Sequence, residues 1–257
     1  MLPLAARMKN GQLCLKPMLQ AIFEQLHSAG FREFAFIVGR GKRAIEDHFS
    51  PDEDFIQYLE SKNKRDLAED LQEFYDKINN SNILFINQPK PKGFGDAVAR
   101  ASIFTGNENF LMQAGDDLII SKSNSHLKKL IRTFEKHDAD TLFLLEEVPD
   151  PRNYGVIVGK EVKPNLFQAT KIVEKPKKPP SNLAIVALYI FKPIIYKAIS
   201  EVNPDKNGEI QLADALKKLI EWNCKVYGLK LDPEERRIDI GTAELYMEML
   251  KSIVIDK

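Results

Sequence analysis

The spacing of apolar and polar residues predicts alternating helices and strands over the first 148 residues of the chain. Apolar residues recur at helical spacing over 16–30, and Gly30 stands where a helix is expected to end. Apolar runs predict strands at 32–38, 82–88, 108–117 and 140–148. Helical patterns fall between them, at 51–78, 97–104 and 124–139. This order is typical of a mostly parallel sheet covered by helices on both faces.

The pattern changes after Pro149, where short β-rich segments replace the alternation. Such segments lie at 154–159, 168–176 and 182–192, separated by glycines and prolines. A helix at 209–223, a strand at 224–231 and a last helix at 241–254 follow them. Residues 1–17, in contrast, show no buried-strand pattern. We expect the whole chain, residues 1–257, to form a single α/β domain.

Composition and charge exclude several classes of protein. Lysine plus arginine and aspartate plus glutamate both total 37, so no net field favours nucleic acid or an anionic membrane. The two cysteines, Cys14 and Cys224, are too few for a disulfide framework or a zinc cluster, and the histidines show no metal-ligand spacing. No apolar run approaches the ~20 residues that span a bilayer, and no signal peptide is evident. We therefore expect a cytoplasmic protein.

Two glycine-containing stretches follow predicted strands and are candidate ligand sites. In FIVGRGKRAIEDHF, residues 36–49, Lys42 and Arg43 follow the glycines and could meet a phosphate at a helix start. A tight turn before a solvated helix is the simpler explanation of that stretch.

The second stretch, NQPKPKGFGDAVARA at 87–101, is more informative. Gln88 ends a strand, and its amide can both donate to and accept from a base edge. Gly93 and Gly95 permit the close backbone approach that a flat base requires. A proline- and glycine-rich surface loop would explain the same residues.

Carboxylates after strands are candidate metal ligands. Asp116 and Asp117 follow the apolar strand in FLMQAGDDLII, at the sheet edge where open α/β sheets bind ligands. A carboxylate there suits a Mg²⁺ ion that also holds substrate phosphates. Asp239, in RRIDIG, is a later carboxylate that could join Asp116 on one metal. Carboxylates in such positions also cap helices, which leaves both explanations open.

Glu174 and Lys175, in IVEKP, end another predicted strand. Strand alternation sends their side chains in different directions. The carboxylate can then accept hydrogen bonds from sugar hydroxyls while the ammonium meets a phosphate. An exposed ion pair is the alternative.

The sequence resembles the bacterial- and archaeal-type UTP–glucose-1-phosphate uridylyltransferases from about Lys16 to its C-terminus. The segments VGRGKRAIEDHF, KGFGDAV, GDDLI, YGVIV, IVEKP, PSNLAIVALYIF and GEIQLADAL occur in the order found in that family. GRGKRAIEDHF together with PSNLAIV favours the uridylyl branch over thymidylyl or adenylyl relatives. The resemblance implies a Rossmann-like nucleotidyltransferase core, with a nucleotide-binding half at 1–148. It also implies a β-rich sugar-binding half that, with the C-terminal helix, occupies 149–257.

The implied reaction makes UDP-glucose and pyrophosphate from UTP and glucose 1-phosphate, with Mg²⁺ and without a covalent enzyme intermediate. By matched motif, Gln88, Gly93 and Asp117 would bind the nucleotide, Asp116 and Asp239 the metal, and Gly155, Glu174 and Lys175 the sugar phosphate. Asp116 and Lys175 would be the catalytic residues. The resemblance further implies a homodimer or homotetramer, with neither nucleic acid nor membrane as a partner.

The start of the chain departs from the family pattern. Relatives carry a G-x-G-T-R loop before the MLP that stands here at 1–3. They also carry a PKEMLP-type segment with a phosphate-binding lysine, for which Lys9 is the candidate here. We expect that the fold of a normal enzyme begins before residue 1. The alternative is a diverged paralogue that binds a nucleotide sugar without transferring it, as a regulatory or assembly subunit.

Overall fold

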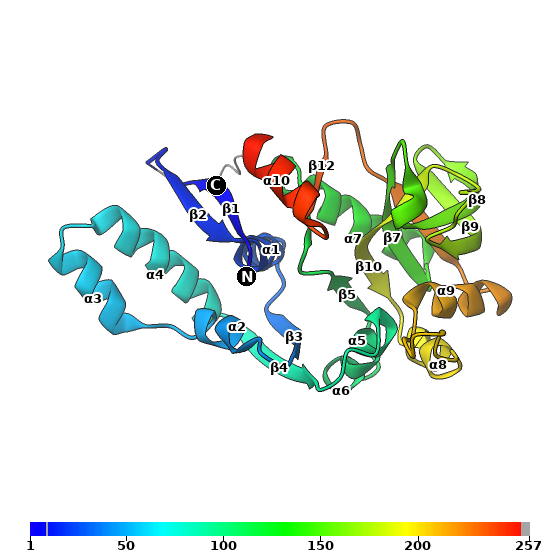
Figure 1. Ribbon diagram of the computed structural model, residues 1–257, viewed down its shortest axis with the longest axis horizontal. Coiled ribbons are helices and arrows are strands. Elements are labelled where there is room, and N and C mark those ends of the chain that lie inside the picture. Colours follow the sequence, from blue (N-terminus) through cyan, green and yellow to red (C-terminus); the bar gives the residue numbers. More distant parts are fainter. Residues whose placement is uncertain (9, 253–257) are drawn as a thin grey trace. The chain divides into compact units, whose positions relative to one another are not determined.

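The protein consists of two compact units, which Figure 1 presents as a computed structural model. The first unit comprises residues 1–89 and the residues from 238 onward, and the second comprises residues 90–237. The structure describes residues 1–8 and 10–252. The boundaries of these units differ from the predicted boundary between a nucleotide-binding half at 1–148 and a sugar-binding half at 149–257. The two halves stay a prediction.

Two parallel strands and four helices make up most of the first unit. Strand β3 (Glu33–Gly39) pairs with β4 (Asn82–Gln88), in register from Glu33 opposite Asn82 to Gly39 opposite Gln88. Parallel neighbours need a crossover between them. The crossover contains α2 (Arg43–His48), α3 (Glu53–Ser61) and α4 (Arg65–Asn79). Helix α1 (Met18–Ser28) precedes the pair, and α10 (Ala243–Ser252) belongs to the same unit.

An aromatic cluster fills the core of the first unit. The ring of Phe23 lies 4.7 Å from that of Phe34 and 5.2 Å from that of Phe49, measured between centroids. Phe74, on α4, packs edge-on against Phe49 at 5.5 Å. Large aromatic side chains in tilted and edge-to-face contact add to the hydrophobic stabilisation of burial. The cluster therefore holds α1, β3 and the crossover helices together.

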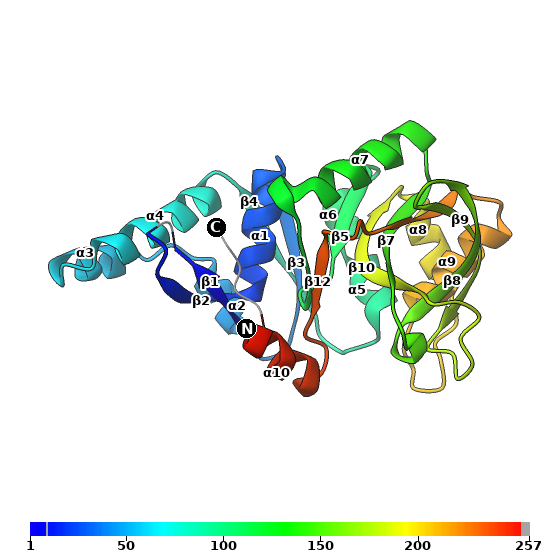
Figure 2. The same cartoon turned by 90° about the horizontal axis from the view of Figure 1, so that it is seen from above.

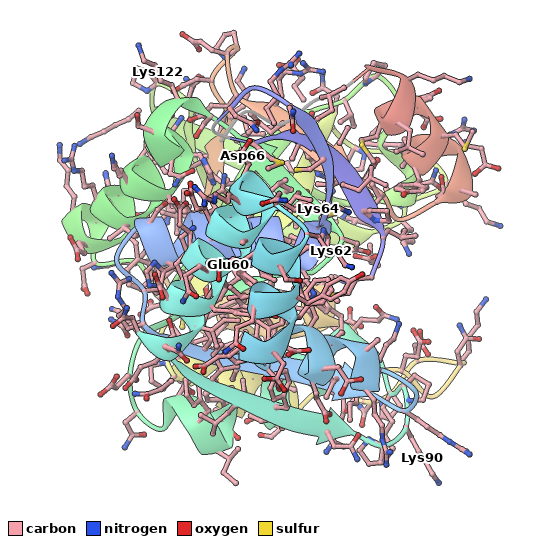
Figure 3. All side chains as sticks on the ribbon, turned by 90° about the vertical axis from the view of Figure 1, so that its left-hand side faces the viewer. Glu60, Lys62, Lys64, Asp66, Lys90 and Lys122 are labelled. Atoms are coloured by element: carbon pink, nitrogen blue, oxygen red, sulfur yellow. The ribbon has the colours of Figure 1, made fainter. Side chains whose placement is uncertain are left out.

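The charged segment at 51–78 forms the pair α3 and α4. The Asp52 carboxylate begins α3 by accepting a hydrogen bond from the Phe55 amide at 3.0 Å. Buried apolar residues lie on one face of each helix, among them Ile56 and Ile78. Charged residues lie where the two helices meet, as Figure 3 shows for Glu60, Lys62, Lys64 and Asp66.

A β-hairpin opens the chain, which corrects the expectation of a start without a strand pattern. Strands β1 (Pro3–Arg7) and β2 (Leu13–Pro17) pair antiparallel. Leu4 and Ala6 point into the core, whereas Leu13 and Leu15 are 63% and 70% exposed. Because these outward positions carry leucine, the hairpin lacks the usual alternation of apolar and polar residues. Lys9, the candidate phosphate lysine, lies outside the described residues.

The second unit contains a six-stranded sheet in the order β5-β10-β7-β11-β9-β8. Figure 2 labels β5, β10, β7, β9 and β8 of this sheet. Its strands are β5 (Phe110–Gln113), β7 (Thr141–Glu147), β8 (Gly155–Lys163), β9 (Leu166–Glu174), β10 (Leu183–Phe191) and β11 (Val226–Lys230). Further strands are β6 (Asp117–Ile120) and β12 (Arg236–Asp239), which begins in this unit. Its helices are α5 (Phe94–Arg100), α6 (Ser102–Thr105), α7 (Ser125–His137), α8 (Ile194–Ser200) and α9 (Leu212–Glu221).

The fold class is confirmed as α/β with a mixed sheet. In the six-stranded sheet β7 and β11 run parallel, whereas β10 runs antiparallel to β5 and β7, and β9 runs antiparallel to β8 and β11. Antiparallel pairs thus have a larger share than the expectation of a mostly parallel sheet implied. The β-rich segments after Pro149 account for that share, because β8, β9 and β10 all lie in them.

Helices α5, α8 and α9 cover one face of the six-stranded sheet. Phe143 and Leu145 of β7 belong to one buried cluster with Ile195 of α8 and Leu216 of α9. Leu144 alternates with these β7 residues and points to the opposite face, and α7 also contacts β7. Among the described residues, no helix has both the length and the apolar character that crossing a membrane requires.

Candidate functional site

The two glycines of the predicted nucleotide loop are in tight contact with the chain's own backbone. The Gly95 amide donates to the Ile210 carbonyl at 2.9 Å, and the Ile210 amide donates to the Lys92 carbonyl at 2.8 Å. A Cβ atom at Gly93 would lie 2.7 Å from the Ile210 carbonyl oxygen, and one at Gly95 would lie 2.8 Å from it. Gly93 also has a φ of +92°, which favours glycine. The close approach seen here is to Ile210, and contact between Gly93 and a base stays a prediction.

Ile210 belongs to the segment GEIQLADAL, which supported the family resemblance and overlaps the helix predicted at 209–223. Its pairing with 92–95 seats α5 next to α9 in the second unit. No local signal marks this contact, because the two segments are more than 100 positions apart.

Gln88 and the turn at Lys42 belong to the first unit. Gln88 is the last residue of β4, is half-buried, and lies opposite Gly39 of β3. Lys42 precedes the short helix α2 and is exposed, as is Arg43. A role for Gln88 in binding uracil and a role for Lys42 or Arg43 in binding phosphate both stay predictions.

Asp116 and Asp117 are neighbours in sequence but lie in opposite environments. Asp116 is exposed in the turn between β5 and β6. Asp117 is only 4% exposed, and its carboxylate accepts hydrogen bonds from the Arg237 guanidinium at 2.6 and 2.9 Å. The Ala187 amide donates to the same carboxylate at 3.2 Å. Asp117 is thus held inside the protein, and its predicted contact with nucleotide is untested.

Arg237 is a buried residue that sequence reasoning missed. Besides Asp117, its guanidinium contacts the Glu146 carboxylate at 3.4 Å and lies over the Tyr154 ring, 4.9 Å from the centroid. In RRIDIG the sequence pointed only to Asp239. The burial of an arginine side chain in a strand leaves no signal in the sequence. Its partner Asp117 is 120 positions away.

Gly155, Glu174 and Lys175 come together at one end of the β8–β9 hairpin. Gly155 lies directly opposite Glu174, and a Cβ at Gly155 would lie 3.0 Å from a carboxylate oxygen of Glu174. This close approach of the carboxylate to the neighbouring strand favours glycine at 155. Lys175 follows with a φ of +40°, and its amide donates to the Tyr154 carbonyl at 3.0 Å. The predicted sugar-phosphate residues thus share one location, although their roles are untested.

The Glu174 carboxyl is half-buried, which disfavours its charged form. Burial is the main cause of a pKa raised above the ordinary value of 4.5. Lys175 opposes this shift of the pKa, Asp214 adds to it, and Lys217 opposes it. Asp214 and Lys217 form an ion pair of 2.7 Å on α9. The surroundings of Glu174 therefore differ from those of a solvated surface ion pair.

The chemistry of the predicted metal ligands fits Mg²⁺. Asp239 is half-buried, and one of its carboxylate oxygens accepts a hydrogen bond from the Gly241 amide at 2.8 Å. Asp116 and Asp239 belong to different units. In the described part of the chain, no three histidine, cysteine or acidic side chains gather as a metal site. Mg²⁺ is commonly held by one or two carboxylates plus substrate phosphates, so two aspartates suffice for this ion.

Comparison with known proteins finds extensive similarity. Residues 2–254 match the nucleotidyl transferase family. A putative UTP–glucose-1-phosphate uridylyltransferase of Methanocaldococcus jannaschii is 35% identical over 255 residues, covering 93% of this chain and 88% of the relative. The UTP–glucose-1-phosphate uridylyltransferase of Pseudomonas aeruginosa is 32% identical, covering 91% and 83%.

Solved structures give the same result. The crystal structure of an apo UDP-glucose pyrophosphorylase has a TM-score of 0.84 at 31% identity, covering 92% of this chain and 86% of its own. A UDP-glucose pyrophosphorylase in complex with UDP-glucose has a TM-score of 0.79 at 30% identity, with the same coverage.

Proposed function

This chain belongs to the nucleotidyl transferase family, and from that premise we propose that it is a UTP–glucose-1-phosphate uridylyltransferase. Under this proposal, a phosphate oxygen of glucose 1-phosphate attacks the α-phosphorus of UTP. The bond from that phosphorus to pyrophosphate breaks on the opposite side, and UDP-glucose is formed. The enzyme contributes positioning and charge stabilisation rather than a covalent nucleophile.

The arrangement of Gly155, Glu174 and Lys175 is the observation that supports this proposal most directly. The Glu174 carboxylate lies close against the backbone at Gly155, and its oxygens can accept hydrogen bonds from sugar hydroxyls. Lys175 is exposed and next in sequence, so its ammonium can neutralise the phosphate attached to that sugar. This combination suits a phosphorylated sugar better than it suits a free sugar or an inorganic anion.

Asp116 and Asp239 would hold Mg²⁺, and Gln88 with Gly93 would bind the uracil of UTP. When bound, the ion would neutralise negative charge on the nucleotide phosphates. The resemblance also implies a homodimer or homotetramer, which sedimentation equilibrium of the purified chain measures.

Pyrophosphate release tests the proposal. We expect the chain to release pyrophosphate from UTP only when glucose 1-phosphate and Mg²⁺ are both present. Asp116→Asn should reduce the rate by on the order of 10²-fold or more, because it removes a charge that faces the metal. The melting temperature of Asp116→Asn, measured alongside the rate, separates a loss of turnover from a loss of folding.

Asp54→Asn is the matched control, because Asp54 is an exposed aspartate on α3. It should turn over at the wild-type rate. Binding of UDP-glucose by the wild-type chain without any pyrophosphate release would overturn the proposal in favour of a nucleotide-sugar-binding paralogue. A wild-type rate for Asp116→Asn would remove Asp116 from the metal site.

A further inference from the structure

Arg237 connects three segments of the second unit, and two of them adjoin a predicted site residue. Its side chain is 6% exposed. The guanidinium contacts the carboxylate of Asp117, the carboxylate of Glu146 and the ring of Tyr154. Asp117 follows Asp116, and Tyr154 precedes Gly155. A single buried cation thus lies between the turn that carries a predicted metal ligand and the strand that carries a predicted sugar ligand.

The contact with Asp117 fixes the end of the turn that carries Asp116. The guanidinium donates through Nε and Nη2, and the two nitrogens engage both carboxylate oxygens. Such forked pairing adds geometric specificity that a lysine does not provide. The Ala187 amide of β10 holds the same carboxylate. Asp116, which is exposed, is thus carried by a backbone that is anchored at the next residue.

The contact with Tyr154 fixes the segment that carries Gly155 and Lys175. The Tyr154 ring lies against the guanidinium, and its carbonyl accepts the hydrogen bond of the Lys175 amide. Lys175 has a positive φ of +40°, which is unfavourable for a residue other than glycine. The hydrogen bond that the Lys175 amide donates to the Tyr154 carbonyl helps to hold that conformation. Moving Tyr154 would thus shift both Gly155 and Lys175.

We propose that Arg237 is a positioning residue that sets the distance between Asp116 and the Gly155–Lys175 region. This inference rests on the proposed uridylyl transfer, in which a sugar phosphate must meet a nucleotide phosphate in line. Misplacement of reacting groups by about 1 Å can reduce a rate on the order of 10²-fold. Substrate binding depends less on this distance, because each substrate can be bound by its own residues.

The inference predicts different effects on turnover and on binding. Arg237→Lys keeps the positive charge but loses the forked pairing and the planar face over Tyr154. We expect this variant to lower kcat 10- to 100-fold while KM for glucose 1-phosphate stays within about threefold of wild type. Without Mg²⁺, calorimetry should show that wild type and Arg237→Lys bind UDP-glucose with affinities that agree within about threefold. Arg236→Lys is the matched control, because Arg236 is the exposed neighbour, and it should behave as wild type.

Amide hydrogen exchange gives a readout that needs neither metal nor turnover. In Arg237→Lys the amide of Lys175 should exchange at least several-fold faster, because the Tyr154 ring has lost its planar partner. Tyr154→Leu should show the same faster exchange and a lowered kcat with the Asp117 ion pair intact. If Arg237→Lys does not fold, Tyr154→Leu tests the same inference by itself.

Three outcomes would overturn the inference. In the first, Arg237→Lys has the same kcat as wild type. If Arg237→Lys does not fold, the same outcome is a wild-type kcat for Tyr154→Leu. In the second, affinity for UDP-glucose falls in parallel with kcat, which is the result of a merely structural role. In the third, exchange at Lys175 is unchanged in both variants. Absence of turnover in the wild type would instead overturn the proposed function.

Discussion

At the scale of single residues, Glu174 is placed where binding and stability conflict. Its half-buried carboxyl has a raised pKa, chiefly because burial disfavours the charge. A carboxyl of this kind binds its proton more tightly in the folded protein than in the unfolded chain. The resulting stability is present at low pH and is lost as the pH rises from the ordinary value of 4.5 through the raised value.

Glu174→Gln should therefore stabilise the fold while weakening sugar binding. The neutral amide avoids the cost of burying a charge, so the melting temperature should exceed that of wild type at pH 7–8. The two melting temperatures should converge near pH 4, where the wild-type carboxyl is protonated. Calorimetric melts from pH 4 to 8 measure the difference, and titration with glucose 1-phosphate at pH 7.5 should show weaker binding.

Glu108→Gln serves as the control, because Glu108 is an exposed glutamate of the same unit. Its melting curve should follow wild type at every pH. A difference between Glu174→Gln and wild type that is constant from pH 4 to 8 would contradict a role for the buried charge.

Residue chemistry was predictable from sequence where it depended on neighbours along the chain. Glu174 and Lys175 are adjacent, and the strand that precedes them could be recognised from its apolar run. Gly155 was assigned to the site only from the family resemblance. Its position opposite Glu174 could not be predicted, since strand register cannot be derived from one sequence. Arg237 was missed entirely, because what defines it is a contact across 120 positions.

At the scale of elements, the strongly periodic segments were the predictable ones. The strand at 82–88 has the predicted bounds, and α1 and α7 lie within their predicted ranges. The hairpin of β1 and β2 was missed because Leu13 and Leu15 face solvent, where polar residues would normally reveal the alternation. Helix α8 was also missed, because it is only seven residues long and directly follows a strand and a proline.

The seating of α5 against Ile210 leads to a prediction at this scale. In Gly95→Ala, the new methyl group would lie 2.8 Å from both the backbone oxygen and a side-chain carbon of Ile210. Overpacking of this kind typically costs about 1–3 kcal/mol. We expect the free energy of unfolding to fall by that amount in urea titrations. Turnover should fall too, because the loop from Lys92 to Gly95 would move.

Gly39→Ala provides the comparison. Its methyl group would lie 3.9 Å from the nearest atom, the Gln88 carbonyl oxygen, so no steric cost is expected. If both variants unfolded at the same urea concentration, the close packing on Ile210 would have no energetic consequence.

At the scale of the whole molecule, the residues predicted to bind the substrates are divided between two compact units. Gln88 belongs to the first unit, and Gly155, Glu174 and Lys175 belong to the second. Gly93 and Asp117, which are also predicted to bind the nucleotide, belong to the second unit. Each substrate should therefore change hydrogen exchange chiefly around its own binding residues. UTP and glucose 1-phosphate should therefore leave separate patterns of protection.

With UTP we expect slower amide exchange around 84–88, and with glucose 1-phosphate slower exchange around 155 and 172–175. In Lys175→Met, the effect of glucose 1-phosphate should disappear, because the phosphate loses its cation, while the effect of UTP should persist. Lys171→Met is the matched control, since Lys171 is an exposed lysine of β9, the strand that Lys175 directly follows, and it should leave both patterns intact. Mass spectrometry of the exchanged peptides resolves these segments. Protection of 172–175 by UTP as strong as that by glucose 1-phosphate would mean that the hairpin end binds the nucleotide, and the assignment of Glu174 and Lys175 to the sugar would be wrong.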